Sequence, residues 1–266
     1  MTEITAAFVQ FRPRFGRIEE NVHRIEALLK GLDAHLAVLP ELASTGYSFE
    51  SRKQLLGLAE SPESSVFLES LARICRTQKM HVATGFAEKS GSRVYNSAAL
   101  VSPKGLVGVY RKMHLFYREK DLFDRASSTP EVFDAGFAQL GLAVCFDWIF
   151  PELFRTLALL GAEIICHSAN LVLPHCQKAM VTRSVENRIF TITANRVGTE
   201  KGKKRASLTF TGKSQIVSPR GEVLVKGSAR GECIGLAEID LREARNKLVT
   251  PKNDVFKDRR TDLYRL

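Results

Sequence analysis

Residues 137–170 read FAQLGLAVCFDWIFPELFRTLALLGAEIICHSAN and combine three predicted elements in one stretch. The apolar run that ends near residue 146 predicts a buried strand, PELFRTLALLG predicts a helix ending at Gly161, and EIICHSAN predicts a second buried strand. A strand, a helix and a strand in this order are typical of α/β proteins. Ligands of such proteins bind where strands end, and Cys145 lies near the end of the first strand.

The same alternation of strands and helices continues on both sides of this stretch. Apolar residues at helical spacing follow the first predicted strand, and Ser61-Pro62 has the pattern of a helix N-cap followed by proline. Strands are further predicted at residues 4–11, 35–40, 81–87, 95–102 and 106–110, and a helix is predicted at about 175–188.

One internal repeat shows how these elements pair. SAALVSPKGLVGVY (97–110) resembles KSQIVSPRGEVLV (213–225), since each is a strand, a Ser-Pro-basic-Gly turn and a strand. A repeat about half a chain apart indicates two similar β-rich halves. Together with the alternating helices, it favours an α/β fold in which two sheets face each other with helices outside. No linker separates the halves, so we expect residues 1–266 to form one domain.

Composition narrows the class of protein. No apolar run reaches the roughly 18 residues that span a bilayer, and the N-terminus lacks a signal-peptide layout, so we expect no membrane contact. The formal net charge is +10, but the densest basic run, KGKKR at 201–205, has no interleaved aromatic residues, which favours a solvated surface over a nucleic-acid interface. The five cysteines are irregularly spaced, which indicates reduced thiols in a cytoplasmic protein.

Three reactive side chains fall at the ends of predicted strands, namely Glu41, Lys112 and Cys145. Taken singly, they also fit a solvated turn residue, a surface lysine and a core thiol. Taken together, they make a chemical unit, because an ordinary cysteine is mainly protonated at neutral pH. A carboxylate can accept the thiol proton, and an ammonium can stabilise both the thiolate and an oxyanion. None of the six histidines is obviously placed for a Cys–His dyad.

The blocks around these residues resemble the three signature blocks of the nitrilase superfamily, the carbon–nitrogen hydrolases. They read LPELASTGY, YRKMHLF and LAVCFDWIFPE, and they occur in the family's order with similar separations. VENRIFTITANRVG resembles the family's segment after the nucleophile, and PKNDVFKDRR resembles one branch of the family. The resemblance covers nearly the whole chain and implies a four-layer α-β-β-α sandwich with two facing mixed β-sheets.

The resemblance also implies a role for each candidate. Glu41 would be the general base, Lys112 the oxyanion-stabilising cation and Cys145 the nucleophile, and Glu119 would be the family's second pocket glutamate. Attack of the thiolate on an amide would give a thioester and ammonia, with the backbone N–H of Phe146 completing the oxyanion site. Water would then hydrolyse the thioester, and no metal or organic cofactor is needed.

The implied substrate is a small, mostly uncharged carboxamide, with aliphatic nitriles and N-carbamoyl amines as alternatives. Its pocket is expected to include Tyr47, Phe146, Trp148 and Asn170, and either of two arginines on the 175–188 helix remains a possible carboxylate clamp, Arg183 or Arg188. Asp147 and Glu152 are expected to brace the turn after the nucleophile rather than react.

The sequence also bears on metal binding, on a non-enzymatic role and on assembly. The pairs Cys166-His167 and His175-Cys176 suggest a metal site. However, the two pairs are nine residues apart, which is wider than the spacing that zinc ligands usually show. A non-enzymatic binding protein would require a lost catalytic residue, and none is lost. The resemblance and the broadly apolar helix at 151–161 predict a homodimer or higher homo-oligomer, because such a helix needs burial on two sides.

Overall fold

The computed structural model describes residues 2–202 and 206–264, so the basic run at 201–205 lies partly outside the described residues. Two six-stranded mixed sheets form the centre of the fold. Sheet one holds, in spatial order, β14 (Cys233–Asp240), β1 (Glu3–Gln10), β2 (Leu36–Val38), β3 (His81–Ser90), β4 (Arg93–Ser102) and β5 (Gly105–Arg111). Sheet two holds β13 (Val223–Lys226), β12 (Gln215–Val217), β9 (Phe190–Asn195), β8 (Ile164–Ala169), β7 (Gln139–Val144) and β6 (Val132–Asp134).

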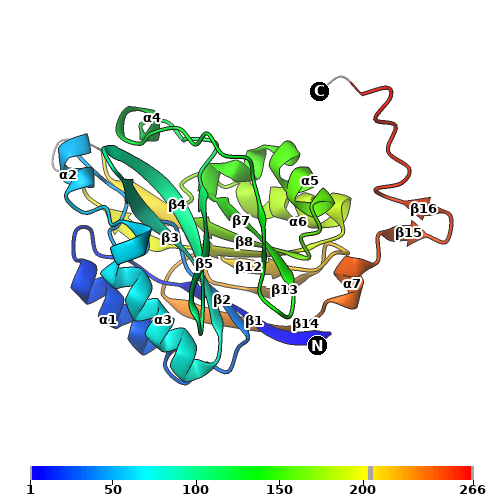
Figure 1. The fold of residues 1–266 in the computed structure, drawn as a ribbon, viewed down its shortest axis with the longest axis horizontal. Helices are drawn as coiled ribbons and strands as arrows, with labels where there is room; N and C mark the ends of the chain where they lie inside the picture. Colours follow the sequence, from blue (N-terminus) through cyan, green and yellow to red (C-terminus); the bar gives the residue numbers. More distant parts are fainter. Residues whose placement is uncertain (1, 203–205, 265–266) are drawn as a thin grey trace.

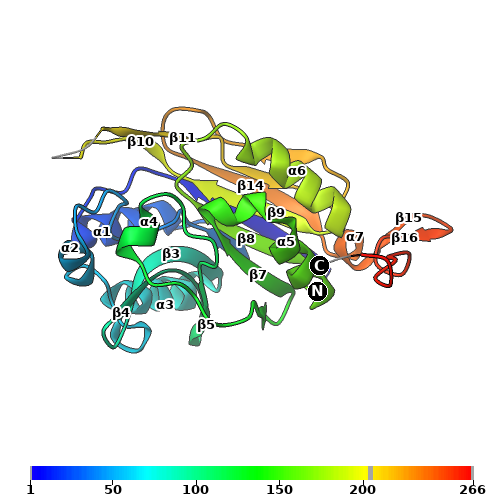
Figure 2. The same ribbon diagram turned by 90° about the horizontal axis from the view of Figure 1, so that it is seen from above.

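Helices cover the outer faces of both sheets, as Figures 1 and 2 show. The larger ones are α1 (Ile18–Leu29) and α3 (Val66–Gln78) on sheet one, and α5 (Pro151–Leu159) and α6 (Cys176–Asn187) on sheet two. Short elements complete the chain: α2 (Arg52–Leu56), α4 (Glu119–Leu122), α7 (Arg242–Arg245), the hairpin β10 (Val197–Glu200) with β11 (Leu208–Thr211), and the ribbon β15 (Leu248–Thr250) with β16 (Asn253–Asp254). The predicted four-layer α-β-β-α sandwich with two facing sheets is therefore confirmed.

The alternation of side chains along β1 builds two of the core layers. Ala6 and Phe8 point into the cluster between the two sheets, whereas Ala7 and Val9 pack against α1 and α3. Successive side chains of a strand point to opposite faces, so a strand covered on both faces must be apolar throughout. This is why β1 and the predicted buried strands of sheet two read as continuous apolar runs.

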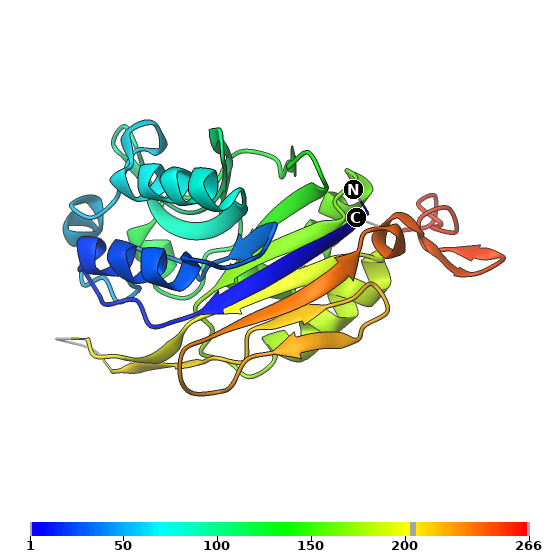
Figure 3. The same ribbon diagram turned by 90° about the horizontal axis from the view of Figure 1, so that it is seen from below.

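The repeated strand–turn–strand segments occupy corresponding places in the two sheets. The first forms β4 and β5 at one edge of sheet one, and the second forms β12 and β13 at one edge of sheet two. Figure 3 shows the opposite edge of sheet one, where β1 in dark blue lies beside β14 in orange. The C-terminal ribbon projects beyond this body in Figures 1 and 3.

Two boundary predictions are wrong. Ser61 does not cap a long helix, because Pro62–Ser64 forms a single 3₁₀ turn and α3 begins after Ser65, whose hydroxyl accepts the backbone N–H of Leu68 at 3.0 Å. The strand predicted to reach residue 146 ends at Val144, and Cys145 begins a 3₁₀ turn that runs to Ile149. No helix within the described ranges has the length and apolar character needed to cross a membrane.

Candidate active site

Four candidate residues meet at one end of the sandwich, and all four are buried. Glu41 lies in the turn that follows β2, Lys112 directly follows β5, Cys145 directly follows β7, and Glu119 begins α4. Their side chains come from different sheets and loops, and each residue is no more than 5% exposed. The turn that carries Glu41 packs tightly on β3, because a Cβ added to Gly85 would lie 2.4 Å from Cα of Glu41.

Lys112 stands at the centre of this group. Its Nζ lies 2.8 Å from Oε1 of Glu41 and 2.7 Å from Oε2 of Glu119. Asn96 donates from Nδ2 to the same Oε1 of Glu41 at 2.7 Å, and Tyr47 donates its hydroxyl to Oε1 of Glu119 at 2.7 Å. Two carboxylates thus share one ammonium, and each is also held by a neutral donor.

The buried charges set the protonation states of the group. Burial alone would lower the pKa of Lys112, but the charges of Glu119 and Glu41 outweigh burial, and the net shift is upward. Burial raises the pKa of Glu119, an effect that Lys112 opposes and Glu41 reinforces. Burial also raises the pKa of Tyr47 well above its ordinary value, so its phenol remains a hydrogen-bond donor. Lys112 therefore stays charged throughout the physiological range.

Cys145 is held as a protonated thiol in a strained turn. Its φ of 44° lies in the left-handed region, which a residue with a Cβ rarely adopts. Burial raises the pKa of the thiol well above its ordinary value, and the charge of Glu41 raises it further, whereas Lys112 and the backbone N–H of Asn170 lower it. The thiol therefore needs a base to ionise it, and Glu41 is a buried carboxylate close enough to influence its pKa.

Asp147 ties the Cys145 turn to the segment that carries Lys112. Its carboxylate accepts the backbone N–H of Val144 at 2.8 Å and the hydroxyl of Tyr110 at 2.9 Å. It also lies 2.8 Å from Nδ1 of His114 and accepts the backbone N–H of that residue at 3.2 Å. Every lone pair of this buried carboxylate is thus directed at the protein, which fits the bracing role expected for it. Glu152 is exposed at the start of α5.

His167 supports the same turn and does not serve as a free ligand. Its Nε2 lies 2.9 Å from the carbonyl oxygen of Cys145, and its Nδ1 lies 3.2 Å from the hydroxyl of Thr193. Burial lowers the pKa of His167, so the ring is neutral at neutral pH. Across residues 2–202 and 206–264, no group of three or more His, Cys, Asp or Glu side chains is arranged to hold a metal ion.

An apolar cavity of about 330 Å³ lies beside the charged group. Tyr47 and Glu119 line it, together with aromatic and aliphatic side chains that include Phe49, Phe116 and Phe123. A small cleft at Cys145 shares Phe116 and Val172 with this cavity. The cavity and the cleft are therefore neighbours on either side of these shared residues.

Three of the four predicted pocket residues line the cleft, and the fourth, Tyr47, lines the apolar cavity instead. Phe146, Trp148 and Asn170 line the cleft, and Asn170 donates from Nδ2 to the backbone oxygen of Glu41 at 2.9 Å. The two arginines considered as clamps bond elsewhere. Arg183 donates to the backbone oxygen of Trp148 at 3.3 Å, and Arg188 donates to the backbone oxygens of Asn246 and Pro219 at 3.3 and 3.2 Å.

Sequence reasoning missed Asn96, the amide that holds Glu41. Asn96 is 1% exposed and lies inside β4, next to the buried Ser97. Two adjacent polar residues in an otherwise apolar strand were the available signal, because a buried polar side chain requires a partner. Alternation along β4 alone does not say which partner that is.

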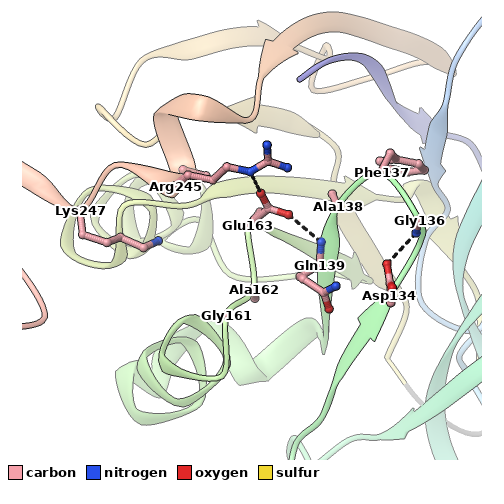
Figure 4. A pocket seen from close by; sticks show the side chains of 11 residues that line it. Asp134, Gly136, Phe137, Ala138, Gln139, Gly161, Ala162, Glu163, Arg245 and Lys247 are labelled. Carbon is pink, nitrogen blue, oxygen red and sulfur yellow. Dashed lines mark hydrogen bonds and ion pairs between the residues drawn. The ribbon is translucent and has the colours of Figure 1, made fainter. Parts of the chain in front are cut away.

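A second cavity, of about 550 Å³, lies near α7 and contains none of the four candidates. Figure 4 shows that the carboxylates of Glu163 and Asp134 are engaged within the protein. Glu163 pairs with Arg245 and accepts the backbone N–H of Gln139 at 2.8 Å. Lys247 donates to the backbone oxygen of Arg188 at 2.8 Å. Burial lowers the pKa of Lys247 to about 8, but the cavity is lined by neither a cysteine nor any of the four candidates, so the site around Lys112 remains the candidate active site.

Comparison with known proteins agrees with this geometry. A family model described as Carbon-nitrogen hydrolase matches residues 5–247. The chain is 45% identical over 264 residues to a protein named Nitrilase from Pyrococcus abyssi, covering 98% of this chain and 99% of that one. It is 31% identical over 269 residues to a 2-oxoglutaramate amidase from Bacillus subtilis, and the match covers 98% of this chain and 99% of that protein. A solved carbon–nitrogen hydrolase from Helicobacter pylori G27 superimposes with a TM-score of 0.88 at 27% identity, covering 99% and 97%.

Proposed function

The chain belongs to the carbon–nitrogen hydrolase family and hydrolyses carbon–nitrogen bonds other than peptide bonds, and we propose that it is a small-molecule amidase that releases ammonia. The observation that carries this proposal is a pair of acceptors on two residues around Cys145, since Glu41 influences the pKa of its thiol and Asn170 lines its cleft. Oε2 of Glu41 and Oδ1 of Asn170 are buried and lack a hydrogen-bond partner within the described part of the chain. A carboxamide brings two N–H donors to such a site, whereas a nitrile brings none.

In the proposed first half-reaction, Glu41 accepts the proton of the Cys145 thiol, and the thiolate attacks the carbonyl carbon of the amide. The resulting oxyanion is stabilised by the ammonium of Lys112 and the backbone N–H of Phe146. Protonated Glu41 then gives its proton to the nitrogen, the carbon–nitrogen bond breaks, and ammonia leaves. Cys145 retains the acyl group as a thioester.

The second half-reaction uses the same groups with water as the nucleophile. Glu41 accepts a proton from water as the water attacks the thioester, and Lys112 again faces the oxyanion. The carbon–sulfur bond breaks, the sulfur takes the proton back from Glu41, and the carboxylic acid leaves. Glu119, paired with Lys112 and Tyr47, is proposed to hold the ammonium in place and to contact the substrate amide. One water is consumed for each ammonia released.

Nitrile hydrolysis is the second candidate function, because the relative at 45% identity is named Nitrilase. Addition of the thiolate to a nitrile would use the same three residues but would place a single nitrogen, without N–H groups, beside the two acceptors. The wall residues Phe146 and Trp148 are compatible with either substrate class.

We expect matched pairs of small amides and nitriles to separate the two activities. Ammonia release from each pair, with an N-carbamoyl amine as a third compound, gives kcat/KM on a common scale. The amide should exceed its matched nitrile, because only the amide satisfies both free acceptors. A nitrile that is favoured by more than about tenfold, equivalent to roughly 1.4 kcal/mol of transition-state stabilisation, would replace the amidase assignment with a nitrilase assignment.

We further propose that the protein is a homodimer, on the basis of an uncovered apolar surface. Leu159 and Leu160 at the end of α5 are 44% and 55% exposed, although the other leucines of that helix are buried. The projecting ribbon exposes Leu248 and Val249. A two-stranded ribbon is barely stable in water by itself, so a second surface that covers it would stabilise it.

Sedimentation velocity at micromolar concentration is therefore expected to show a species of twice the chain mass of 29.7 kDa. Leu160→Glu and Val249→Asp should each shift the equilibrium toward monomer, since each places a charge in the surface that the second subunit would cover in the dimer. Val66→Glu is a matched control, because Val66 is also exposed but lies at the start of α3 on the other face. Wild-type protein that sediments only as a monomer would contradict the dimer.

A further inference from the structure

A buried ion pair lies just behind the site, at the base of the β10–β11 hairpin. Arg196 follows β9, and Glu200 ends β10. Arg196 is fully buried and Glu200 is 6% exposed, and Nη1 of the arginine contacts Oε1 of the glutamate. The guanidinium also donates to the backbone oxygen of Pro13 at 3.1 Å and lies over the ring of Phe210, 4.1 Å from its centroid. The pair is therefore fixed on several sides.

The carboxylate of this pair holds the backbone of the loop that carries Tyr47. Glu200 accepts the backbone N–H of Tyr47 at 3.1 Å and that of Ser48 at 2.8 Å. The loop bends closely around the carboxylate at Gly46, where φ is 77° and an added Cβ would lie 2.8 Å from Oε1 of Glu200. A glycine is required there both by the backbone conformation and by the close approach.

Tyr47 carries this restraint into the catalytic group. Its backbone is held by Glu200, its ring meets the ring of Phe210 edge-on at a centroid distance of 6.0 Å, and its hydroxyl donates to Glu119 at 2.7 Å. Glu119 in turn pairs with Lys112. A continuous series of contacts therefore runs from the ion pair through Tyr47 to the ammonium at the centre of the site.

The same hairpin forms part of the cavity wall. Leu208, the first residue of β11, lines the apolar cavity together with Tyr47 and Phe116. Burying an arginine and a glutamate is costly unless both are well paired, and an apolar pair of similar volume often stabilises a core equally well. The retained charges therefore call for a role beyond stability.

We propose that Arg196 and Glu200 are positioning residues that fix Tyr47 against Glu119 and thereby set the orientation of Lys112 during amide hydrolysis. The pair makes no contact with the side chain of Cys145 or Lys112, and the route proposed here runs through Tyr47. This inference rests on the proposed amidase function. It gives the base of the β10–β11 hairpin a role in positioning the active site.

A double-mutant cycle tests this role. Glu200→Gln, Tyr47→Phe and their combination are compared with wild type in the full chain, with kcat/KM measured by ammonia release. Each kcat is corrected for the fraction of chains whose Cys145 reacts with fluoroacetamide, in which the thiolate forms a sulfur–carbon bond and displaces fluoride. Each single variant should lose about ten- to a hundredfold in kcat/KM, the range expected for a hydrogen bond to a charged group. The combined loss should stay within about threefold of the Tyr47→Phe loss, because both changes break one series of contacts.

Two further variants keep the test decisive. Thr209→Ala is the matched control, since its hydroxyl pairs with Thr199 on the exposed side of the same hairpin at 3.0 Å, and it should retain wild-type kcat/KM. If Glu200→Gln unfolds because it leaves Arg196 unpaired, Arg196→Met combined with Glu200→Gln removes both charges and takes its place in the cycle.

Multiplicative losses in the cycle, or near-normal kcat/KM in the folded Glu200 variant, would overturn the positioning role. Neither result would affect the proposed function. That function fails separately, if wild-type protein releases no ammonia from the amides or favours the matched nitriles by more than about tenfold.

Discussion

Cys145→Ala is expected to abolish ammonia release while leaving the melting temperature close to that of wild type. In the proposed mechanism the sulfur forms the thioester in the first half-reaction and leaves it in the second, so its removal should cost at least about ten-thousandfold in kcat. Alanine keeps the Cβ and therefore leaves the strain at φ 44° unchanged. Turnover is measured by ammonia release and folding by thermal unfolding.

The matched control for this prediction is Cys233→Ala. Cys233 is a free thiol on β14 and is partly exposed, and neither the apolar cavity nor the cleft at Cys145 is lined by it. This variant should retain wild-type kcat. Residual activity above about 1% in Cys145→Ala, well outside the loss expected for a nucleophile, would show that another group performs the attack.

Lys112→Met is expected to damage both activity and stability. The substitution leaves Glu41 and Glu119 buried without their shared cation, and breaking a buried pair in this way typically costs about 3–5 kcal/mol. Loss of a cation that faces the oxyanion should cost about a hundred- to a thousandfold in kcat. Urea unfolding gives the first quantity, and ammonia release at saturating substrate gives the second.

The pH dependence of the unfolding free energy tests whether the lost stability of Lys112→Met comes from buried carboxylates. Burial and Glu41 already raise the pKa of Glu119, and removal of Lys112 takes away the opposing effect. A carboxyl with a raised pKa in the folded chain favours folding below its unfolded pKa of about 4.3, and that contribution is lost as pH rises through the folded pKa. The difference in unfolding free energy between wild type and Lys112→Met should therefore narrow as pH falls from about 7 toward 4. A difference that stays constant between pH 7 and pH 4 would mean that removing the Lys112 ammonium does not raise the pKa of Glu119 further.

The strand-end rule selected from sequence three candidates that the structure brings together, because Glu41, Lys112 and Cys145 each follow a strand at the same end of the sandwich. It could not locate Glu119, which reaches Lys112 only through a tight turn in which Tyr117 adopts a φ of 46°. Such left-handed positions have no reliable signal in residues other than glycine and asparagine. The family resemblance, rather than periodicity, supplied that residue.

The ion pair behind the site was also outside the reach of sequence patterns. Arg196 follows an apolar strand in TANRVG, and an arginine at such a place signals a buried partner only in retrospect. Strand β14 was missed for a related reason. Its Gly235 resembles a strand breaker, yet a Cβ at that position would lie 2.3 Å from Cζ of Phe8. Close packing between distant strands, which requires this glycine, is invisible in the local sequence.

The pairing of β1 with β14 also means that sheet one can be completed only late in folding. The two strands match residue for residue from Glu3 opposite Asp240 to Gln10 opposite Cys233, so the first strand made and one of the last share an edge. During synthesis, that edge of β1 stays unpaired until the chain beyond residue 240 has left the ribosome. Contacts this distant in sequence close slowly, and unpaired strand edges invite aggregation. The yield of folded enzyme should therefore depend on how fast β14 pairs with β1, and on how well the unpaired edge of β1 is protected from other chains before that pairing.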